Sequence, residues 1–195
     1  MNWYLDTHPH GLDLDQALAQ VSEQRRRYAL RYKRESDQRL SLSAWLLLQR
    51  ALRDEFGIDE QPLFRYTPQG KPLLEGHDDI HFSLSHCDEA VACVVGRHAV
   101  GIDVESLSQY DPALLEATMS EEEIRQVRAA HRPEVAFMRL WTMKESLLKL
   151  TGEGIRDRLD DVLVDAASYR FQTLIASRFV CTVCEKMTCD SSFAS

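Results

Sequence analysis

Two carboxylates in one short segment of the sequence could hold a cation. Residues 101–105 read Gly-Ile-Asp-Val-Glu and alternate as a strand, so Asp103 and Glu105 should point to the same side. Carboxylates this close repel each other unless water or a cation lies between them. Mg²⁺ prefers oxygen ligands and takes few protein carboxylates beside phosphate and water. By itself the segment also fits an exposed strand end, so both interpretations stay open.

A second candidate segment, Trp-Thr-Met-Lys-Glu-Ser-Leu-Leu-Lys, lies within a predicted long helix at residues 141–149. Spacings of four place Trp141, Glu145 and Lys149 on one helix face. A core tryptophan beside an ordinary surface ion pair explains the same spacing.

Hydroxyl, imidazole and ammonium groups suited to an anion occur between these residues and the N-terminus. Residues 82–86 alternate as a strand, whose two apolar side chains should face inward while Ser83 and Ser85 face the other way. His86 then lies at the strand end, where its ring and a serine hydroxyl could donate hydrogen bonds to phosphate. Lys71 follows a glycine turn, but the pattern of a P-loop is absent. Structural roles for these side chains remain the alternative.

The net charge of −8 conceals a basic segment in an acidic chain. Residues 25–39 hold seven basic and two acidic side chains, which leaves 16 basic and 29 acidic side chains elsewhere. This balance argues against a nucleic-acid binder and favours an anion site or an acidic partner for the basic segment. The seven basic residues are Arg25, Arg26, Arg27, Arg31, Lys33, Arg34 and Arg39.

The five cysteines and the apolar runs indicate the class of protein. An odd number of cysteines without a paired framework is typical of reduced thiols. Cys181 and Cys184, with Cys189 nearby, lack the four-ligand pattern of a closed zinc site and are expected to be small buried groups. No apolar run approaches the roughly 20 residues of a membrane helix, and the first residues do not resemble a secretory signal. We therefore expect a cytoplasmic protein that does not bind membranes.

The predicted elements that would position these groups form two similar series. Each series begins with a strand, continues with helices and ends with strands, and a soft boundary falls near residues 96–99. The class is therefore α+β. The expected strands are residues 2–7, 80–85, 90–95, 100–105 and two or three within 161–185, with extended segments at 62–74. The expected helices are residues 12–32, 36–56, one that Ser120 and Glu123 cap, and 133–150.

Four motifs follow one another along the chain: Gly70-Lys-Pro, Phe82-Ser-Leu-Ser-His86, Gly101-Ile-Asp-Val-Glu105 and Trp141-Thr-Met-Lys-Glu-Ser-Leu-Leu-Lys149. The set and its order resemble the 4′-phosphopantetheinyl transferase superfamily, in its larger single-chain type. The resemblance implies a pseudo-dimer of two α+β halves, residues 1–98 and 99–195, with the active site at their junction. It also implies Mg²⁺-dependent transfer of the phosphopantetheine arm of coenzyme A to a serine of an apo acyl or peptidyl carrier protein, with release of adenosine 3′,5′-bisphosphate.

Position by position, the resemblance also implies roles for individual residues. Asp103, Glu105 and Glu145 would hold Mg²⁺, with Mn²⁺ as an alternative. Glu145 would also be the general base, and Lys149 would contact phosphate and stabilise charge on the departing bisphosphate. Contacts with coenzyme A phosphates would come from Lys71, Ser85 and His86, and the contact with the 3′-phosphate from Arg27, Arg31 or Arg39. One departure from the family pattern is the pair Cys87-Asp88 where a small pair is common.

Two other functions fit the same residues. A Mg²⁺-dependent hydrolase would cleave coenzyme A or another nucleotide diphosphate with water. A non-catalytic module would use the basic segment to bind an acidic carrier protein. Loss of activity on replacing Asp103 or Glu145 would separate either enzyme from the module. We expect a monomer, because the two halves share one chain.

Overall fold

The computed structural model describes residues 2–107, 111–154 and 159–187. The first part of the chain contains β1 (Asn2–Asp6), α1 (Leu14–Gln20), α2 (Glu23–Ala29), α3 (Glu35–Phe56), β2 (Phe64–Tyr66), β3 (Pro72–Leu74), β4 (His81–His86) and β5 (Val91–Gly96). The second part contains β6 (Val100–Ser106), α4 (Pro112–Thr118), α5 (Glu121–Ala129), α6 (Pro133–Thr151), β7 (Tyr169–Ile175) and β8 (Phe179–Lys186). Single 3₁₀ turns occupy Pro9–Gly11 and Ala166–Ser168.

The two parts of the chain have the same topology. Each has one strand, two short helices, one long helix and a closing antiparallel pair. The strand order is β1-β5-β4 in one three-stranded sheet and β6-β8-β7 in the other, so the first strand pairs with the last in both. The hairpin β2-β3 is an addition to the first part. The predicted α+β pseudo-dimer is confirmed.

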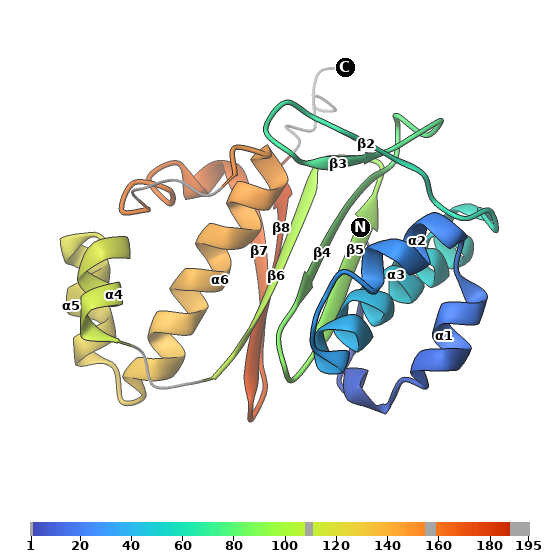
Figure 1. Cartoon of the computed structure of the whole chain (residues 1–195). Coiled ribbons are helices and arrows are strands. Elements are labelled where there is room, and N and C mark those ends of the chain that lie inside the picture. Colours follow the sequence, from blue (N-terminus) through green and yellow to red (C-terminus); the bar gives the residue numbers. More distant parts are fainter. Residues whose placement is uncertain (1, 108–110, 155–158, 188–195) are drawn as a thin grey trace, which may run out of the picture.

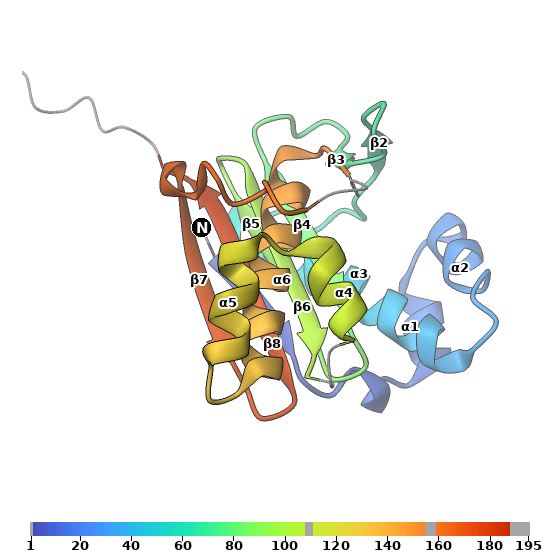
Figure 2. The same cartoon turned by 90° about the vertical axis from the view of Figure 1, so that its left-hand side faces the viewer.

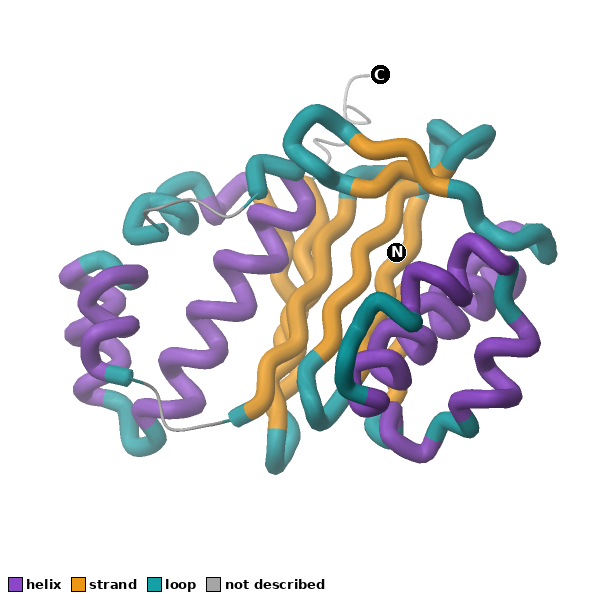
Figure 3. The backbone as a smooth tube through the Cα atoms, viewed as in Figure 1, coloured by secondary structure: helices purple, strands orange, loops and turns teal. Residues whose placement is uncertain are grey.

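The two sheets lie between the two long helices (Figure 1). The apolar face of α3, which includes Leu48, packs on one face of the first sheet around Phe82. The other face of that sheet meets the second sheet through an apolar cluster that includes Val94 and Ile102. Helix α6 covers the far side of the second sheet, so the layers run helix, sheet, sheet, helix (Figure 3). Strands β4 and β6 lie side by side at the junction, where the amide of Ile102 donates to Oγ of Ser83 at 3.2 Å.

Local sequence signals explain where several elements begin and end. Helix α3 stops at Gly57 and α6 stops at Gly152, both with positive φ, a conformation that glycine adopts without strain. The predicted capping box of α5 is confirmed, because Oγ of Ser120 accepts from the amide of Glu123 while the Glu123 carboxylate accepts from the amide of Ser120. Helices α4 and α5 pack outside α6 (Figure 2).

The single helix predicted for residues 12–32 is wrong. Val21 is extended, with φ −107° and ψ 159°, and Ser22 begins α2 by accepting a hydrogen bond from the amide of Arg25 at 3.2 Å. Helix α4 was not predicted, and residues 161–168 form turns and a 3₁₀ turn instead of a strand. In α4 and in residues 161–168, hydrogen bonds of local turns and helix caps determine the backbone conformation, and the apolar periodicity is too weak to indicate it.

The alternation predicted for residues 82–86 is confirmed, because Phe82 and Leu84 pack in the apolar cluster beneath α3, but the serine face of the strand is buried as well. Ser83 and Ser85 are buried, since they face β6, while Leu84 is only partly buried. Cys181 and Cys184 are free and buried on β8, and burial raises the pKa of each thiol to about 12. Cys189 lies outside the described residues. Within the described ranges, no helix is both long enough and apolar enough to cross a membrane.

Candidate functional site

A buried carboxylate joins the two halves of the fold. Asp103 on β6 is 2% exposed, and its Oδ1 accepts hydrogen bonds from Oγ of Ser85 at 2.9 Å and from Nζ of Lys149 at 2.6 Å. These partners come from β4 and from α6, the helix that carries the motif of residues 141–149. A strand of each half and this helix therefore meet at one oxygen atom of Asp103. The second oxygen, Oδ2, is buried without a hydrogen-bond partner among the described residues. An unsatisfied buried carboxylate oxygen is a ready ligand for a hard cation.

Gly101 explains how α6 comes close enough to reach Asp103. A Cβ atom at this position would lie 1.9 Å from the carbonyl oxygen of Ser146 and 2.7 Å from the amide nitrogen of Leu150. The backbone of β6 therefore lies directly against the backbone of α6. Because Asp103 follows Gly101 by two residues on the strand and Lys149 follows Ser146 by three on the helix, this approach brings their side chains together.

The three predicted metal-ligating carboxylates influence one another electrostatically. Burial, followed by the negative charge of Asp103, raises the pKa of Glu105 to about 7, although Lys149 and a hydrogen bond from Trp141 act in the opposite direction. Burial and the charge of Asp103 also raise the pKa of Glu145. A divalent cation would reverse this repulsion.

The described residues contain no group of three or more His, Cys, Asp or Glu side chains arranged as a metal site. The donor chemistry nevertheless suits a hard cation. Asp103, Glu105 and Glu145 offer only oxygen atoms, and Oδ2 of Asp103 is buried and unpartnered. The Lys149 ammonium already neutralises the other oxygen of Asp103. The residues present therefore fit Mg²⁺ by donor type and charge.

Glu145 and Lys149 line a cavity of about 370 Å³ between α6 and the hairpin β2-β3. Lys71 lines the same cavity, and its Nζ donates to the carbonyl oxygen of Leu150 at 2.6 Å. This contact joins the hairpin to the C-terminal turn of α6, where carbonyl groups favour a cation. Burial lowers the pKa of Lys71. The structure thus brings three of the predicted site residues to one cavity.

A second cavity, of about 430 Å³, continues the first toward α2. The two share lining residues, among them Gly70 and Leu84, and form one groove. His86 lines the second cavity, where partial desolvation and the positive charge of Lys149 lower the pKa of its ring. The other walls include an arginine and several aromatic rings, namely Arg25, Tyr28, Tyr32, Trp45, Phe64 and Tyr66.

Arg25 is the arginine that lines the second cavity. Its Nη2 donates to the carbonyl oxygen of Ser41 at 2.5 Å and to the Ser41 hydroxyl at 2.6 Å. The guanidinium carbon lies 4.7 Å from the ring centroid of Tyr28 and 5.0 Å from that of Trp45. Its Nε is buried without a hydrogen-bond partner among the described residues, and burial lowers its pKa. The guanidinium charge and the aromatic walls suit a phosphorylated ring compound.

The three arginines predicted for the 3′-phosphate do not line either cavity. Arg27 pairs with Glu23 at 2.9 Å in an exposed position, and Arg39 pairs with Glu35 and donates to the carbonyl oxygen of Leu12. Arg31 lies 5.9 Å from the ring of Tyr28. Helical spacing indicates that Arg25 differs from these three arginines. Arg25 lies four residues before the fully buried Ala29, so the two residues share the inward face of α2.

Comparisons with known proteins agree with this geometry. A model described as 4'-phosphopantetheinyl transferase, N-terminal, matches residues 6–98, and the model of the 4'-phosphopantetheinyl transferase superfamily matches residues 99–188. The chain is 35% identical over 148 residues to 4'-phosphopantetheinyl transferase gsp of Aneurinibacillus migulanus, an alignment that covers 74% of this chain and 62% of that protein. It is 34% identical over 138 residues to 4'-phosphopantetheinyl transferase psf-1 of Bacillus pumilus, covering 69% and 59%.

A third relative covers more of both chains. The 4'-phosphopantetheinyl transferase Sfp of Bacillus subtilis (strain 168) is 26% identical over 168 residues, which are 80% of this chain and 75% of Sfp. The chain spans only 62% and 59% of the lengths of gsp and psf-1. Because matches to two models of one superfamily follow each other along residues 6–188, the chain belongs to the 4′-phosphopantetheinyl transferase superfamily, in its larger single-chain type.

Proposed function

We propose that the protein transfers the 4′-phosphopantetheine group of coenzyme A to a serine of an apo acyl or peptidyl carrier protein. The supporting observation is the cluster of Ser85, Asp103 and Lys149 at the junction of the two halves, which adjoins a groove lined by basic and aromatic side chains. The relatives named above are all transferases of this type. No observation favours a hydrolase or a non-catalytic module over this reaction.

The reaction exchanges one phosphorus–oxygen bond for another. The serine oxygen of the carrier forms a bond to the phosphorus of phosphopantetheine, and the bond from that phosphorus to the bridging oxygen breaks. The bridging oxygen leaves with adenosine 3′,5′-bisphosphate, and the serine proton goes to a base. Such a transfer depends mainly on positioning the two partners and on neutralising the charge of the diphosphate.

We assign the cation to Asp103, Glu105 and Glu145. Bound there, Mg²⁺ would neutralise charge on the coenzyme A diphosphate, and Mn²⁺ could replace it. Glu145 also accepts the serine proton, directly or through one water molecule. It lines the groove, and burial raises its pKa toward the range of an effective general base.

The basic residues of the groove hold the phosphates. Lys149 stabilises the charge on the departing bisphosphate, and His86 and Lys71, which line the groove, donate hydrogen bonds to the diphosphate. Ser85, which lines neither cavity and donates to Asp103, contributes from beside the carboxylate. Arg25 takes the 3′-phosphate in place of Arg27, Arg31 and Arg39. The groove supports this order, since Arg25 lies in the cavity beyond His86.

We further propose that the protein acts in the cytoplasm, as a monomer, and without nucleic acid. The four described cysteines are free and buried, as expected in a reducing compartment. The pseudo-dimer supplies both sides of the junction from one chain. The chain is acidic overall, with a net charge of −8, which disfavours nucleic acid.

The test is intact-protein mass spectrometry of apo acyl and peptidyl carrier proteins incubated with the protein, coenzyme A and Mg²⁺. The expected result is the addition of one phosphopantetheine group, which EDTA and the variants Glu145→Ala and Asp103→Asn abolish. Glu121→Gln is the matched control, because this carboxylate is exposed at the first turn of α5, and it should keep full activity. Breakdown of coenzyme A without transfer would establish a hydrolase instead. Intact coenzyme A and unmodified carriers would refute both enzymes.

A further inference from the structure

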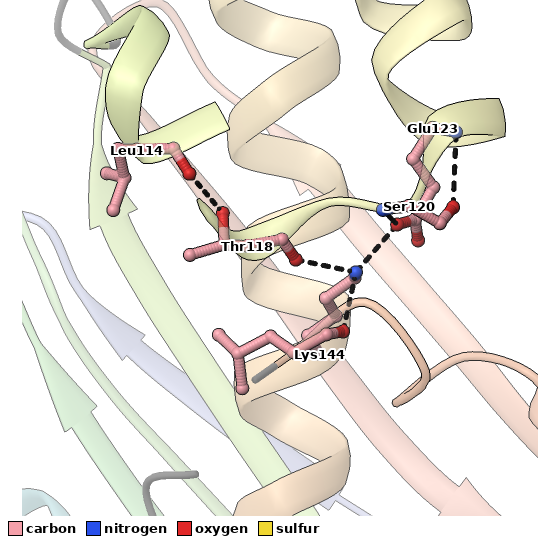
Figure 4. A network of polar contacts seen from close by, with 6 residues as sticks. Leu114, Thr118, Ser120, Glu123 and Lys144 are labelled. Atoms are coloured by element: carbon pink, nitrogen blue, oxygen red, sulfur yellow. Dashed lines mark hydrogen bonds and ion pairs between the residues drawn. The ribbon is translucent and has the colours of Figure 1, made fainter. Parts of the chain in front are cut away.

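The side chain of Lys144 is completely buried, and its ammonium group makes three hydrogen bonds. Nζ donates to the carbonyl oxygen of Thr118 at 3.0 Å, to Oε2 of Glu123 at 2.7 Å and to the carbonyl oxygen of Leu159 at 2.8 Å (Figure 4). An ammonium group has three donors, so all of them are used. Lys144 lines neither cavity of the groove, although it directly precedes Glu145. Its contacts therefore lie away from the proposed substrate site.

The acceptors of Lys144 are themselves held in place. Thr118 ends α4, and its hydroxyl donates to the carbonyl oxygen of Leu114 at 2.6 Å. The Glu123 carboxylate also accepts from the amide of Ser120 at 2.7 Å, as part of the capping box of α5 (Figure 4). One buried ammonium thus connects α6 with the end of α4, the start of α5 and the chain at Leu159. Each contact constrains the direction in which Lys144 leaves the helix.

The opposite side of α6 is fixed by backbone contact. Gly101 of β6 lies against the carbonyl oxygen of Ser146, and the hydroxyl of Thr142 lies 2.7 Å from the hydroxyl of Thr182 on β8. Rotation of α6 about its own axis would break the Lys144 contacts on one side or these contacts on the other. Since successive residues are about 100° apart on a helix, the same rotation would swing Glu145 away from Asp103.

We propose that Lys144 and Glu123 are positioning residues that set the rotation of α6 and so hold Glu145 and Lys149 toward Asp103. The inference rests on the proposed function. A buried ion pair contributes little net stability over apolar residues of the same size, because both charges lose their hydration. Its geometric constraint on the helix is consequently the property that apolar substitutes cannot reproduce.

The decisive variant is the double substitution Lys144→Met with Glu123→Met. Methionine has a similar length, so the double variant fills the same space and leaves neither charge unpaired. It should fold, yet kcat for carrier modification should fall about 100-fold, as expected for a displacement of about 1 Å in an active site. KM for coenzyme A should change less than about threefold, since Arg25 and the rest of the groove remain. Lys144→Met alone should lower both kcat and thermal stability.

Leu52→Ala is the matched control for lost stability. Leu52 is 1% exposed on α3, in the core of the other half, and its truncation creates a cavity far from α6. Measured well below its melting temperature, this variant should keep the kcat of the unmodified protein. A double methionine variant with unchanged kcat, or a control with an equal loss, would overturn the proposal.

Amide hydrogen exchange separates failure of this inference from failure of the proposed function. In the double variant, exchange should accelerate in residues 118–123 and 141–150 while α3 remains unchanged. If the unmodified protein transfers no phosphopantetheine, the proposed function is wrong, and the positioning role is then decided by exchange alone. Unchanged exchange in α6 would overturn the positioning role in either case.

Discussion

Replacing Gly101 by alanine perturbs the candidate site without removing any of its polar groups. The new Cβ atom would lie 1.9 Å from the carbonyl oxygen of Ser146, whereas ordinary contacts begin at 3.4 Å. Helix α6 or strand β6 must therefore move by about 1.5 Å, the difference between these two distances. Both colliding groups are backbone atoms, so a change of side-chain rotamer cannot relieve the clash. The displacement would directly separate Nζ of Lys149 from Oδ1 of Asp103, which lie 2.6 Å apart in the unmodified protein.

The expected loss of activity is larger than the loss of stability. Overpacking of a well-packed interior costs about 1–3 kcal/mol, which a folded domain with about 5–15 kcal/mol of stability usually survives. A misplacement of about 1 Å costs about 100-fold in rate. We therefore expect Gly101→Ala to fold with a lower melting temperature and to lose at least about 100-fold in kcat/KM for carrier modification.

The assay combines thermal unfolding with intact-mass measurement of carrier modification at a temperature where the variant is folded. Gly11→Ala is the control, because a Cβ atom at Gly11 meets nothing within 4 Å. The control should match the unmodified protein in both measurements. Full transfer activity in Gly101→Ala would refute the idea that close backbone approach of β6 and α6 positions the site.

Four further results follow from the groove and from the carboxylates beside it. Arg25→Ala should raise KM for coenzyme A about tenfold or more and leave KM for 3′-dephospho-coenzyme A unchanged, because it removes a charge-assisted hydrogen bond to the 3′-phosphate; equal effects on both substrates would contradict this assignment. Proton NMR should give His86 a pKa below 6.5, and Lys149→Met should raise it, since the ammonium is one cause of the lowering; an unchanged value would be inconsistent with this cause. In the folded protein His86 binds its proton less tightly than in the unfolded chain, because its pKa is lowered. The free energy of unfolding should therefore decrease as the pH falls below about 7, and this decrease should continue until the pH passes the lowered pKa of His86. EDTA should stop transfer, and excess Mg²⁺ should restore it. Activity that persists in EDTA would contradict the assignment of a cation to Asp103, Glu105 and Glu145.

The features that depend on neighbouring residues were predictable from the sequence. The helix stops at Gly57 and Gly152 and the capping box at Ser120 each depend on contacts within a few residues, so local patterns suffice. The repeated series of strand, helices and strands is compatible with the duplicated α+β topology that the two sheets show, and the resemblance to the family implied that duplication. The break at Ser22 was missed because apolar periodicity continues across it.

The sequence by itself determined the chemical groups of the site and their order along the chain. The motif helix and the Gly-Ile-Asp-Val-Glu strand indicate which carboxylates and ammonium groups are available. Only the tertiary structure decided which of them meet: Ser85 reaches Asp103 because β4 and β6 lie side by side, and Arg25 faces the groove while Arg27 faces solvent. The same holds for Lys144, whose acceptors lie 15 to 26 residues away in the chain. The physical reason is that spacing within one strand or helix fixes which side chains share a face, whereas contacts between elements depend on how their backbones pack.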